Sequence, residues 1–338
     1  MMKRSNILYI GNKRKKKTKS PTTLEGLVKY LESENYRVYS SSEKSNKISR
    51  LLDMCFSVFQ YRNKIDYLLI DTYSTSNFYY AFFTSQIARL FCIKYIPILH
   101  GGNLPSRLDR SKLISNLIFK NSYKNIAPSG YLKHEFEKKS YKVELIPNVI
   151  DIEEYKFKER SNIEPKLLYV RAFSKIYNPI MAINVLRKLS LKYPNVKLCM
   201  VGPIKDNSFN EVEDLVDKLN LQDNIEFTGY LTKKEWHKKS NDFDIFINTT
   251  NVDNTPVSLI EAMALGLPVV STNVGGIPFL ITHQADGLLV EKNNVDEMVD
   301  TIISLIEGNN QSLAMNARKK VESFTWNVVK HKWLKILE

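Results

Sequence analysis

Two acidic residues stand in the stretch NTTNVDNTPVSLIEAMALGLPVV, which covers residues 248–270. Seven residues separate Asp253 from Glu261, and an apolar run follows the second acid. A carboxylate that is withdrawn from water without a partner is costly, because it loses its hydration. The two acids therefore indicate that this stretch binds something.

The same stretch predicts an anion site at the start of a helix. Thr255 is predicted as the N-cap and Pro256 as the first helical residue. The amides of Val257 and Ser258 then have no partner within the helix and favour an oxyanion. The side chain of Glu261 leans back toward this helix start, so both acids can face one sugar nucleotide. The alternative is that the acids are ordinary solvated residues of a turn and a helix.

Strand-like and helix-like segments alternate along the whole chain, which is typical of parallel sheets covered by helices. The predicted strands are residues 7–10, 37–39, 67–70, 96–99, 125–127, 144–146, 167–170, 196–201, 225–227, 245–248, 268–271 and 287–290. The predicted helices include residues 23–34, 78–91, 132–139, 179–192, 210–219 and 257–265. We predict an α/β fold of two doubly wound, Rossmann-like domains that face each other across a cleft, with ligands beyond the carboxyl ends of the strands.

The length of 338 residues also favours two domains, because one core rarely serves so long a chain. The predicted first domain spans residues 1–150 and the second spans residues 166–325. Residues 151–165, rich in charge and ending in proline, are predicted as the linker. A last helix is predicted over residues 326–338.

The excess of positive over negative charge lies entirely in the first half of the chain. Residues 1–150 carry 26 Lys and Arg against 11 Asp and Glu, whereas residues 151–338 carry 23 against 25. This asymmetry predicts an anionic partner, either nucleic acid or an anionic membrane surface. Six cations lie between Lys13 and Lys19, where we expect attraction to anionic lipid or to a pyrophosphate-linked acceptor. A solvated loop or a localisation signal are the alternatives.

Cysteine spacing and the N-terminal residues predict a reduced, cytoplasmic location, and the basic first half adds the expectation of a peripheral place on the inner face of the plasma membrane. The three cysteines lie far apart, and no apolar segment of signal-peptide length follows the first basic residues. The most apolar span, residues 78–98, is interrupted by Gln86, Arg89 and Lys94, so no transmembrane helix is predicted. Its first residues, FYYAFF, are predicted as a core helix in preference to a stacking or membrane-touching surface.

Together with other short motifs, the stretch from Asp253 resembles the nucleotide-sugar site of GT-B glycosyltransferases of family 4. That family has two Glu residues with seven between them, followed by an Ala-Met-Ala-x-Gly-x-Pro-Val run. The further matching motifs are HGG (100–102), APSGYL (127–132), LIPNVID (145–151), VGP (201–203) and STNVGGIPFLI (271–281). The second half matches strongly, and the first 95 residues match only in pattern.

The resemblance implies a retaining, metal-independent hexosyl transfer from a nucleotide diphosphate sugar. A UDP-sugar is the expected donor, no further cofactor is implied, and the acceptor would be a glycan or a lipid-linked molecule in surface polysaccharide or glycolipid synthesis. By the same resemblance, the helix at residues 326–338 would return to the first domain.

The resemblance also assigns roles to single residues. Glu261 would accept hydrogen bonds from the ribose hydroxyls, Asp253 would hold hydroxyls of the donor sugar, and His100 would face that sugar from the first domain. The nucleotide and its diphosphate would be bound by the backbone at Thr255, Pro256, Val257 and Ser258, and Gly202 of the VGP motif is assigned to the same site.

Two departures from the family pattern bear on the donor. Asp253 stands where the family has Glu, and is shorter by about 1.5 Å. The family also has a Gly-Arg pair followed by a Lys, whereas this chain places Arg171 at the Gly and Tyr177 at the Lys. Arg171 or Lys175 is therefore expected to neutralise the diphosphate.

A second acidic pair, Asp242 and Asp244, matches the Asp-x-Asp of metal-dependent sugar transferases. Asp244 opens a buried strand, so we interpret this pair as structural and predict no metal. A nucleotide-sugar epimerase of the same fold is the alternative enzyme, and a basic protein that binds nucleic acid or a membrane is the alternative from another class. No nucleic-acid partner is expected, because the basic run is not interleaved with aromatic residues.

Overall fold

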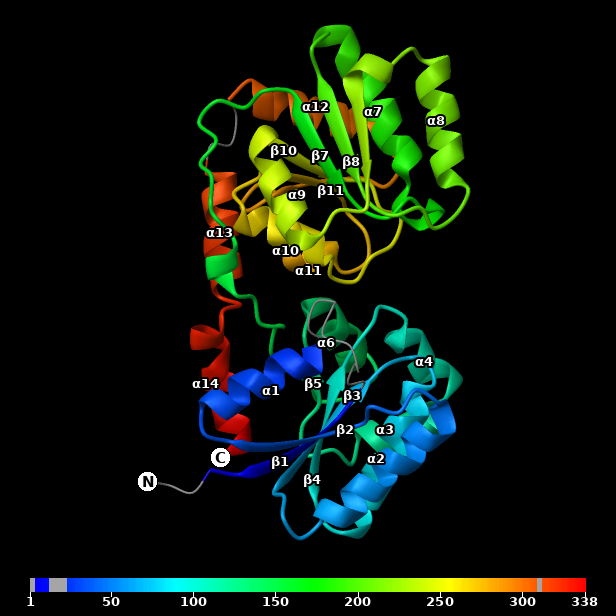
Figure 1. Ribbon diagram of the computed structural model, residues 1–338, viewed down its shortest axis with the longest axis vertical. Helices are drawn as coiled ribbons and strands as arrows, with labels where there is room; N and C mark the ends of the chain where they lie inside the picture. Colours follow the sequence, from blue (N-terminus) through cyan, green and yellow to red (C-terminus); the bar gives the residue numbers. More distant parts are fainter. Residues whose placement is uncertain (1–3, 12–22, 309–311) are drawn as a thin grey trace. The chain divides into compact units, whose positions relative to one another are not determined.

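Two compact units make up the computed structural model, which describes residues 4–11, 23–308 and 312–338 (Figure 1). Unit 1 combines residues 1–149 with residues 324–338, and unit 2 is formed by residues 150–323. Each unit is built on a six-stranded sheet in which neighbouring strands are parallel. The prediction of two doubly wound α/β domains is confirmed.

The sheet of unit 1 has the strand order β2-β1-β3-β4-β5-β6. The strands are β1 (Asn6–Ile10), β2 (Arg37–Ser41), β3 (Tyr67–Thr72), β4 (Lys94–Leu99), β5 (Ile126–Ala127) and β6 (Glu144–Leu145). The helices are α1 (Thr23–Ser33), α2 (Lys47–Tyr61), α3 (Asn77–Leu90), α4 (Leu104–Arg110), α5 (Lys112–Phe119), α6 (Gly130–Glu137) and α14 (Trp326–Leu337).

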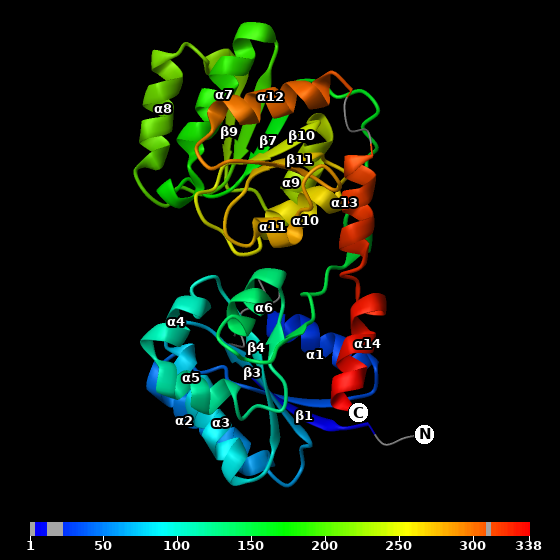
Figure 2. The same cartoon turned by 180° about the vertical axis from the view of Figure 1, so that it is seen from behind.

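The helices of unit 1 divide between the two faces of its sheet. Crossovers between parallel strands are right-handed, so the path from β1 outward to β2 and the path back to β3 place α1 and α2 on opposite faces. One core joins the sheet to α2, α3, α4, α5 and α6. The other joins it to α1 and α14, which lie side by side in Figures 1 and 2.

The chain returns to unit 1 with its last helix. Val329, Trp333 and Leu337 of α14 are buried in the core that α1 also covers. The indole N–H of Trp326 and the Lys330 ammonium both donate to Glu34 Oε1, at 3.2 and 3.1 Å. Residues 324–338 therefore complete one face of the unit 1 sheet.

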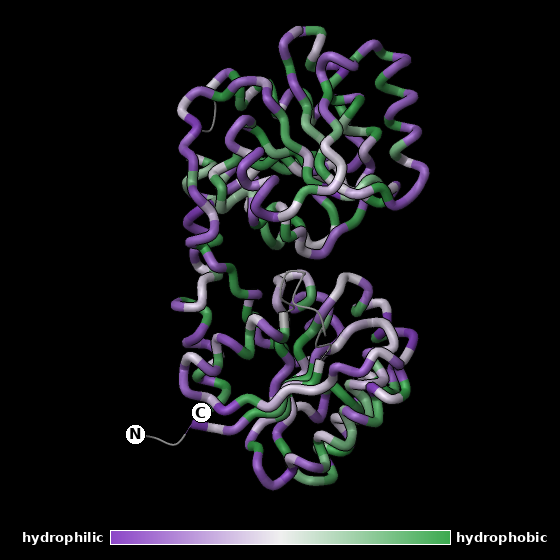
Figure 3. The backbone as a smooth tube through the Cα atoms, in the orientation of Figure 1, coloured by the Kyte–Doolittle hydropathy of each residue, from purple (hydrophilic) through white to green (hydrophobic). Residues whose placement is uncertain are grey.

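The sheet of unit 2 has the strand order β12-β11-β10-β7-β8-β9. The strands are β7 (Lys166–Val170), β8 (Lys197–Val201), β9 (Ile225–Gly229), β10 (Ile245–Asn248), β11 (Val269–Thr272) and β12 (Leu288–Val290). The helices are α7 (Pro179–Lys192), α8 (Ser208–Lys218), α9 (Lys233–Lys239), α10 (Val257–Ala264), α11 (Ile277–Leu280), α12 (Val295–Ile306) and α13 (Leu313–Glu322). Short 3-10 helices are η1 (Ile152–Glu154), η2 (Lys175–Tyr177), η3 (Gln222–Asn224) and η4 (Ser240–Asp242). In both units the sheet strands include the most hydrophobic stretches of the chain (Figure 3).

The structure corrects the linker that the sequence predicts at residues 151–165, because these residues pack as part of unit 2. The Arg160 side chain, 1% exposed, donates hydrogen bonds of 2.8 to 3.2 Å to five backbone carbonyls. Burial lowers the pKa of Arg160 to about 10, and the nearby Asp244 carboxylate opposes this shift. Residues 151–165 thus have the charged composition of a linker, but they are held to unit 2 by these hydrogen bonds.

Asp244, the second acid of the Asp-x-Asp pair, has structural partners at the start of β10. Its Oδ2 accepts from the Glu164 amide at 3.2 Å, and its Oδ1 lies 3.7 Å from Arg160 Nε. Within the described ranges, no three residues of the types His, Cys, Asp and Glu are grouped so that they could hold a metal ion.

Two predictions from the sequence concern membranes: the role of a basic run and the absence of a transmembrane helix. The basic run from Lys13 to Lys19 lies outside the described residues, so its expected role stays a prediction. Across the described part of the chain, no helix is both long and apolar enough to cross a bilayer.

Replacing Trp333 by Ala should destabilise unit 1, because the indole is 3% exposed and fills the core beneath α14. We expect the free energy of unfolding of this unit to fall by about 3 to 5 kcal/mol, measured by urea denaturation followed by circular dichroism. Val328→Ala on the same helix is the control, since Val328 is 49% exposed. Equal effects of the two substitutions would contradict the packing of α14 on unit 1.

Candidate active site

The strand order of unit 2 reverses at β7 and β10, which pair with each other although β8 and β9 follow β7 along the chain. Loops that leave two such strands diverge, and α/β sheets bind ligands in the space between them. Arg171 follows β7 directly, and Asp253 lies in the loop after β10. Two residues selected from the sequence thus lie at this reversal point.

Arg171 and Asp253 form an ion pair between Nη2 and Oδ2, and their side chains are only 14% and 15% exposed. Arg171 Nε also lies 3.4 Å from Asn248 Oδ1, and the guanidinium lies 4.8 Å from the centre of the Tyr177 ring. Burial raises the pKa of Asp253, and the Arg171 cation opposes this rise. The proposed diphosphate cation and the proposed sugar-binding acid therefore neutralise each other in this structure.

Glycines allow the backbone on both sides of this ion pair to pack closely. A Cβ on Gly202 would lie 1.9 Å from the Arg171 carbonyl oxygen. On the other side, a Cβ on Gly276 would lie 1.7 Å from the Asn254 carbonyl oxygen, and the Gly276 amide donates to Asp253 O at 2.8 Å. Gly202 therefore sets the position of Arg171, and Gly276 sets that of Asp253.

The helix α10 begins at Val257, the start of the predicted helix, but its cap differs from the predicted one. Pro256 is its N-cap, with ψ of 118°, and makes no side-chain cap, so neither Thr255 as N-cap nor Pro256 as first helical residue is correct. The reason is that Pro256 keeps an extended backbone, and the Leu259 amide is the first to donate back to it, at 3.1 Å.

Two hydroxyls at the start of α10 are buried without a partner. Within the described residues, Thr255 Oγ1 and Ser258 Oγ make no hydrogen bond. A buried polar atom without a partner costs about 1 to 3 kcal/mol, and an acceptor ligand would offset that cost. With the amides of Val257 and Ser258, these hydroxyls form a donor set suited to an oxyanion.

Glu261 of α10 is 8% exposed and belongs to a second cluster. Its Oε1 accepts from the Tyr155 hydroxyl at 3.0 Å and lies 3.8 Å from both Lys233 Nζ and His237 Nε2. Burial raises the pKa of Tyr155 far above its usual value, and the Glu261 carboxylate raises it further. Tyr155 therefore stays protonated and acts as a donor to Glu261.

The sequence does not predict Tyr155, Lys233 or His237 as site residues. Lys233 Nζ lies 4.5 Å from the centre of the Tyr155 ring, and the rings of Tyr155 and His237 lie 4.8 Å apart. His237 Nε2 is buried and makes no hydrogen bond to any described residue. Tyr155 stands 106 positions before Glu261, and its only signal in the sequence is that it is one of two aromatic residues, with Phe157, inside a run of charges.

Lys175, the alternative cation, is not brought together with Asp253. Its ammonium lies 3.0 Å from Glu211 Oε1 of α8, and its side chain is 69% exposed. Asp206 holds the Lys175 backbone instead, by accepting from its amide at 2.9 Å.

His100 lies in unit 1, in a buried group at the carboxyl ends of its central strands. Asp71 Oδ1 is 2.8 Å from His100 Nε2 and also accepts from the Tyr9 hydroxyl at 2.8 Å. The Tyr73 ring stacks on the imidazole, with centres 4.6 Å apart. Burial and the Asp71 charge raise the pKa of Tyr9 well above its usual value, so Tyr9 donates. Asp71, a single acid in a buried strand, is the partner that the sequence analysis missed.

The strand order of unit 1 also reverses, because β1 and β3 pair while β2 lies on the far side of β1. The space beyond β1 and β3 is therefore the expected binding position in this sheet. A Cβ on Gly11, the residue after β1, would lie 2.5 Å from Asp71 Oδ2. The backbone of Gly11 therefore packs directly against the carboxylate that holds His100.

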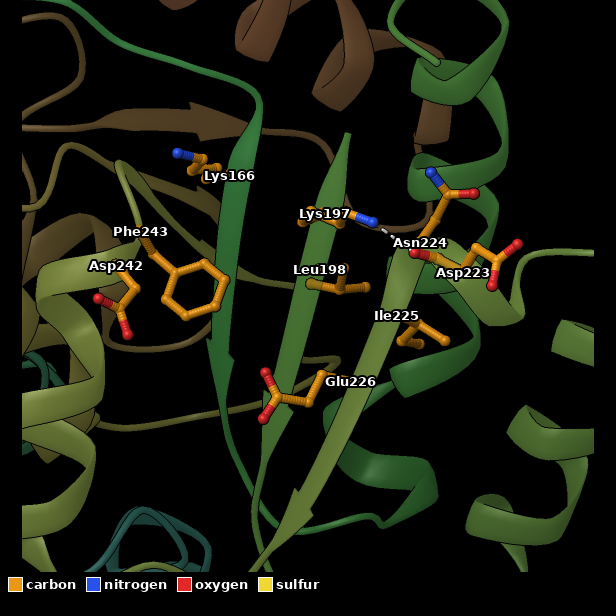
Figure 4. A pocket seen from close by; sticks show the side chains of 9 residues that line it. All are labelled: Lys166, Lys197, Leu198, Asp223, Asn224, Ile225, Glu226, Asp242 and Phe243. Atoms are coloured by element: carbon orange, nitrogen blue, oxygen red, sulfur yellow. Dashed lines mark hydrogen bonds between the residues drawn. The ribbon is translucent and has the colours of Figure 1, made fainter. Parts of the chain in front are cut away.

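A hollow of about 280 Å³ lies elsewhere in unit 2, lined by Lys166, Lys197, Leu198, Asp223, Asn224, Ile225, Glu226, Asp242 and Phe243 (Figure 4). Lys166, Lys197 and Ile225 are the first residues of β7, β8 and β9, so the hollow lies at the amino ends of these strands. Lys197 Nζ donates to Asp223 O at 2.6 Å. The carboxyl ends, where Arg171 and Asp253 lie, are the expected binding edge of the sheet.

Residues 151–322, slightly more than half of the chain, match the family model of the glycosyl transferases group 1. The amylovoran biosynthesis glycosyltransferase AmsK of Erwinia amylovora is 25% identical over 201 residues, which are 53% of this chain and 49% of AmsK. The putative colanic acid biosynthesis glycosyltransferase WcaL of Escherichia coli (strain K12) is 31% identical over 134 residues, which are 37% of this chain and 33% of WcaL. The chain thus spans half or less of the length of these curated relatives.

Among solved structures, the crystal structure of Anabaena HepE in complex with UDP-glucose is similar over 98% of this chain and 99% of HepE. The TM-score is 0.75 and the sequence identity is 16%. At this identity the likeness establishes the fold of the two Rossmann-like domains.

The ion pair should make stability depend on pH once the cation is removed. In Arg171→Met the pKa of the buried Asp253 should rise further, so its ionised form becomes more costly. Stability relative to the unsubstituted chain should therefore fall as pH rises through the pKa of Asp253, to a deficit of about 3 kcal/mol near neutral pH. Urea denaturation from about pH 4 to about pH 8 measures this dependence.

Lys175→Met is the matched control, because its pair with Glu211 is exposed and should contribute less than about 1 kcal/mol. A deficit in Arg171→Met that stays constant with pH would contradict the burial and pairing of Asp253.

Proposed function

The chain belongs to the glycosyl transferases group 1 family, and on this premise we propose that it is a retaining, metal-independent GT-B glycosyltransferase of family 4. It transfers a hexose from a nucleotide diphosphate sugar, with a UDP-sugar as the expected donor, to a glycan or lipid-linked acceptor. One observation carries this proposal. The hydroxyls of Thr255 and Ser258, which are buried and have no partner among the described residues, lie at a helix start that follows the loop of Asp253.

The diphosphate is proposed to bind at the start of α10. The amides of Val257 and Ser258 and the two buried hydroxyls supply donors, and Arg171 supplies a cation from the neighbouring loop. As the glycosidic bond breaks, negative charge grows on the diphosphate, and donors already in place stabilise it without reorganising.

The ribose is proposed to bind at Glu261. In the described part of the chain, all the contacts of this carboxylate end on Oε1. Oε2 is therefore the oxygen assigned to the ribose hydroxyls. The Tyr155 hydroxyl holds Oε1 in place and His237 packs against the Tyr155 ring, so both are positioning residues in this proposal.

Asp253 is proposed to hold hydroxyls of the donor sugar. Its ion pair with Arg171 stabilises the carboxylate charge, and this weakens Asp253 as a nucleophile. We accordingly assign the retained configuration of the transferred sugar to a mechanism in which the acceptor attacks from the side of the departing diphosphate. Polar contacts from Asp253 are the means by which one sugar would be preferred over another.

Other proteins support the donor and the acceptor class. Anabaena HepE was crystallised with UDP-glucose, and AmsK and WcaL carry names from amylovoran and colanic acid biosynthesis. We accordingly propose a role in surface polysaccharide or glycolipid synthesis, in the cytoplasm and peripheral to its membrane.

The response of thermal stability to donors should depend on Glu261. At 100 times its dissociation constant, the correct UDP-, GDP- or ADP-sugar should stabilise the chain by about 2.7 kcal/mol. Glu261→Ala should abolish this stabilisation, and Tyr155→Phe should reduce it, because the carboxylate then loses its donor. Thermal unfolding with each nucleotide sugar, in the presence of EDTA, measures both effects.

Glu226→Ala is the control, since Glu226 lines the hollow of Figure 4 and pairs with Lys239 at 2.7 Å. An undiminished response in Glu261→Ala would remove Glu261 from the site. Loss of the stabilisation by nucleotide sugars in Glu226→Ala alone would indicate that the donor binds in that hollow. Product formation without any added acceptor would favour an epimerase over a transferase.

His100 should affect turnover without affecting nucleotide binding. His100→Ala should lower kcat by about 100-fold, because a lost polar contact to the reacting sugar acts on the transition state. The stabilisation by UDP should stay unchanged, since the residues proposed to bind UDP all belong to unit 2. His134→Ala, on α6 of the same unit, is the control, and equal kcat values for the two variants would exclude His100 from the reaction.

A further inference from the structure

Three helices of unit 1 expose large apolar side chains on their outer side. The side chains are between 40% and 81% exposed, and we call them the apolar face: Ile48, Leu52, Phe56 and Phe59 on α2, Tyr79, Phe83 and Leu90 on α3, and Leu113 and Leu117 on α5. Along α2 they recur every three or four residues, so they form one stripe on that helix.

The three helices form a continuous layer on one side of the sheet. The cluster that joins them to the sheet includes Met54 of α2, Ala81 of α3 and Phe119 of α5. The helix α3 contacts both α2 and α5, and both views of the cartoon show α2 and α3 side by side (Figures 1 and 2). Each helix is thus apolar toward the sheet and apolar again on its outer side.

A helix that is apolar on both sides is normally covered on both sides. Single exposed apolar residues are common on soluble proteins, but a contiguous group of them marks a surface that binds something. In unit 2, by contrast, α7 has Leu191 as its one large exposed apolar residue among the described positions. The FYYAFF segment of α3 contributes to both sides of the helix: Phe78 is fully buried in the core, whereas Tyr79 and Phe83 are each 45% exposed.

The charges on the three helices and at their C-caps are mostly positive. Cations lie on the three helices or at their C-caps: Lys47, Arg50, Arg62, Arg89, Lys112 and Lys120. The one acid on these helices, Asp53, is half-buried and accepts from Ser41 Oγ at 3.3 Å. The Arg62 guanidinium lies 4.1 Å from the centre of the Phe59 ring, so cation and aromatic side chain share one site.

Apolar side chains surrounded by cations complement a surface that is apolar beneath and anionic above, as a leaflet of anionic lipid is. Long cationic side chains can reach lipid phosphates while the aromatic and aliphatic side chains enter the acyl boundary. We propose that the apolar face of α2, α3 and α5 seats unit 1 on an anionic membrane.

Vesicle sedimentation tests this proposal with the full chain. The unsubstituted chain should sediment with phosphatidylcholine vesicles that contain phosphatidylglycerol, and far less with phosphatidylcholine alone. The triple variant Leu52→Ser, Phe56→Ser and Leu90→Ser should lower the partition coefficient at least about tenfold, because each large apolar side chain contributes to transfer from water. All cations are kept, including those between Lys13 and Lys19.

The control replaces exposed apolar residues elsewhere: Leu191→Ser, Met315→Ser and Val328→Ser, which are 70%, 42% and 49% exposed. This variant should sediment like the unsubstituted chain. Both triple variants should keep the thermal response to the best nucleotide sugar, so loss of vesicle binding and loss of donor binding are separate results.

Three outcomes would overturn the proposal. The first is equal sedimentation of the two triple variants, and the second is equal binding to neutral and anionic vesicles. The third is that the chain does not bind vesicles but forms a dimer, and that only the triple variant Leu52→Ser, Phe56→Ser and Leu90→Ser is monomeric. This result would assign the apolar face to contact with a second copy of the chain. Light scattering distinguishes the third outcome.

Discussion

The close approach of two loops at the reversal of strand order is the constraint on which the candidate site depends. Arg171 and Asp253 reach each other because β7 and β10 are neighbours in the sheet. The approach requires Gly202 on one side and Gly276 on the other, where any side chain would overlap a carbonyl oxygen. The electrostatics of the site therefore rest on backbone packing, and the ion pair is a result of that packing.

The two units repeat one arrangement of charge. At the reversal point of unit 1, Asp71 is buried and holds His100 and Tyr9. At that of unit 2, Asp253 is largely buried and holds Arg171. In both, a glycine lies against the acidic residue, Gly11 on the Asp71 carboxylate and Gly275 on the Asp253 backbone. Each sheet thus places a carboxylate with side-chain partners where its strands diverge.

The sequence predicts those parts of the structure that depend on local pattern. The strand Ile245–Asn248 and the helix Pro179–Lys192 have the predicted bounds, and the last helix, Trp326–Leu337, ends one residue before the predicted bound. Apolar periodicity determines these elements. The pairing of Arg171 with Asp253 and of Tyr155 with Glu261 depends on tertiary contacts between distant segments. The charged composition of residues 151–165 predicted a linker, which is wrong because Arg160 donates hydrogen bonds to buried carbonyls of unit 2.

The division of the chain into units has a consequence for its synthesis on the ribosome. Unit 2 is continuous, whereas unit 1 is interrupted and regains α14 only after residues 150–323 have been made. Domains generally fold as they emerge, but the sheet face that α14 covers stays open through that interval. The unit translated first is therefore the one that is completed last.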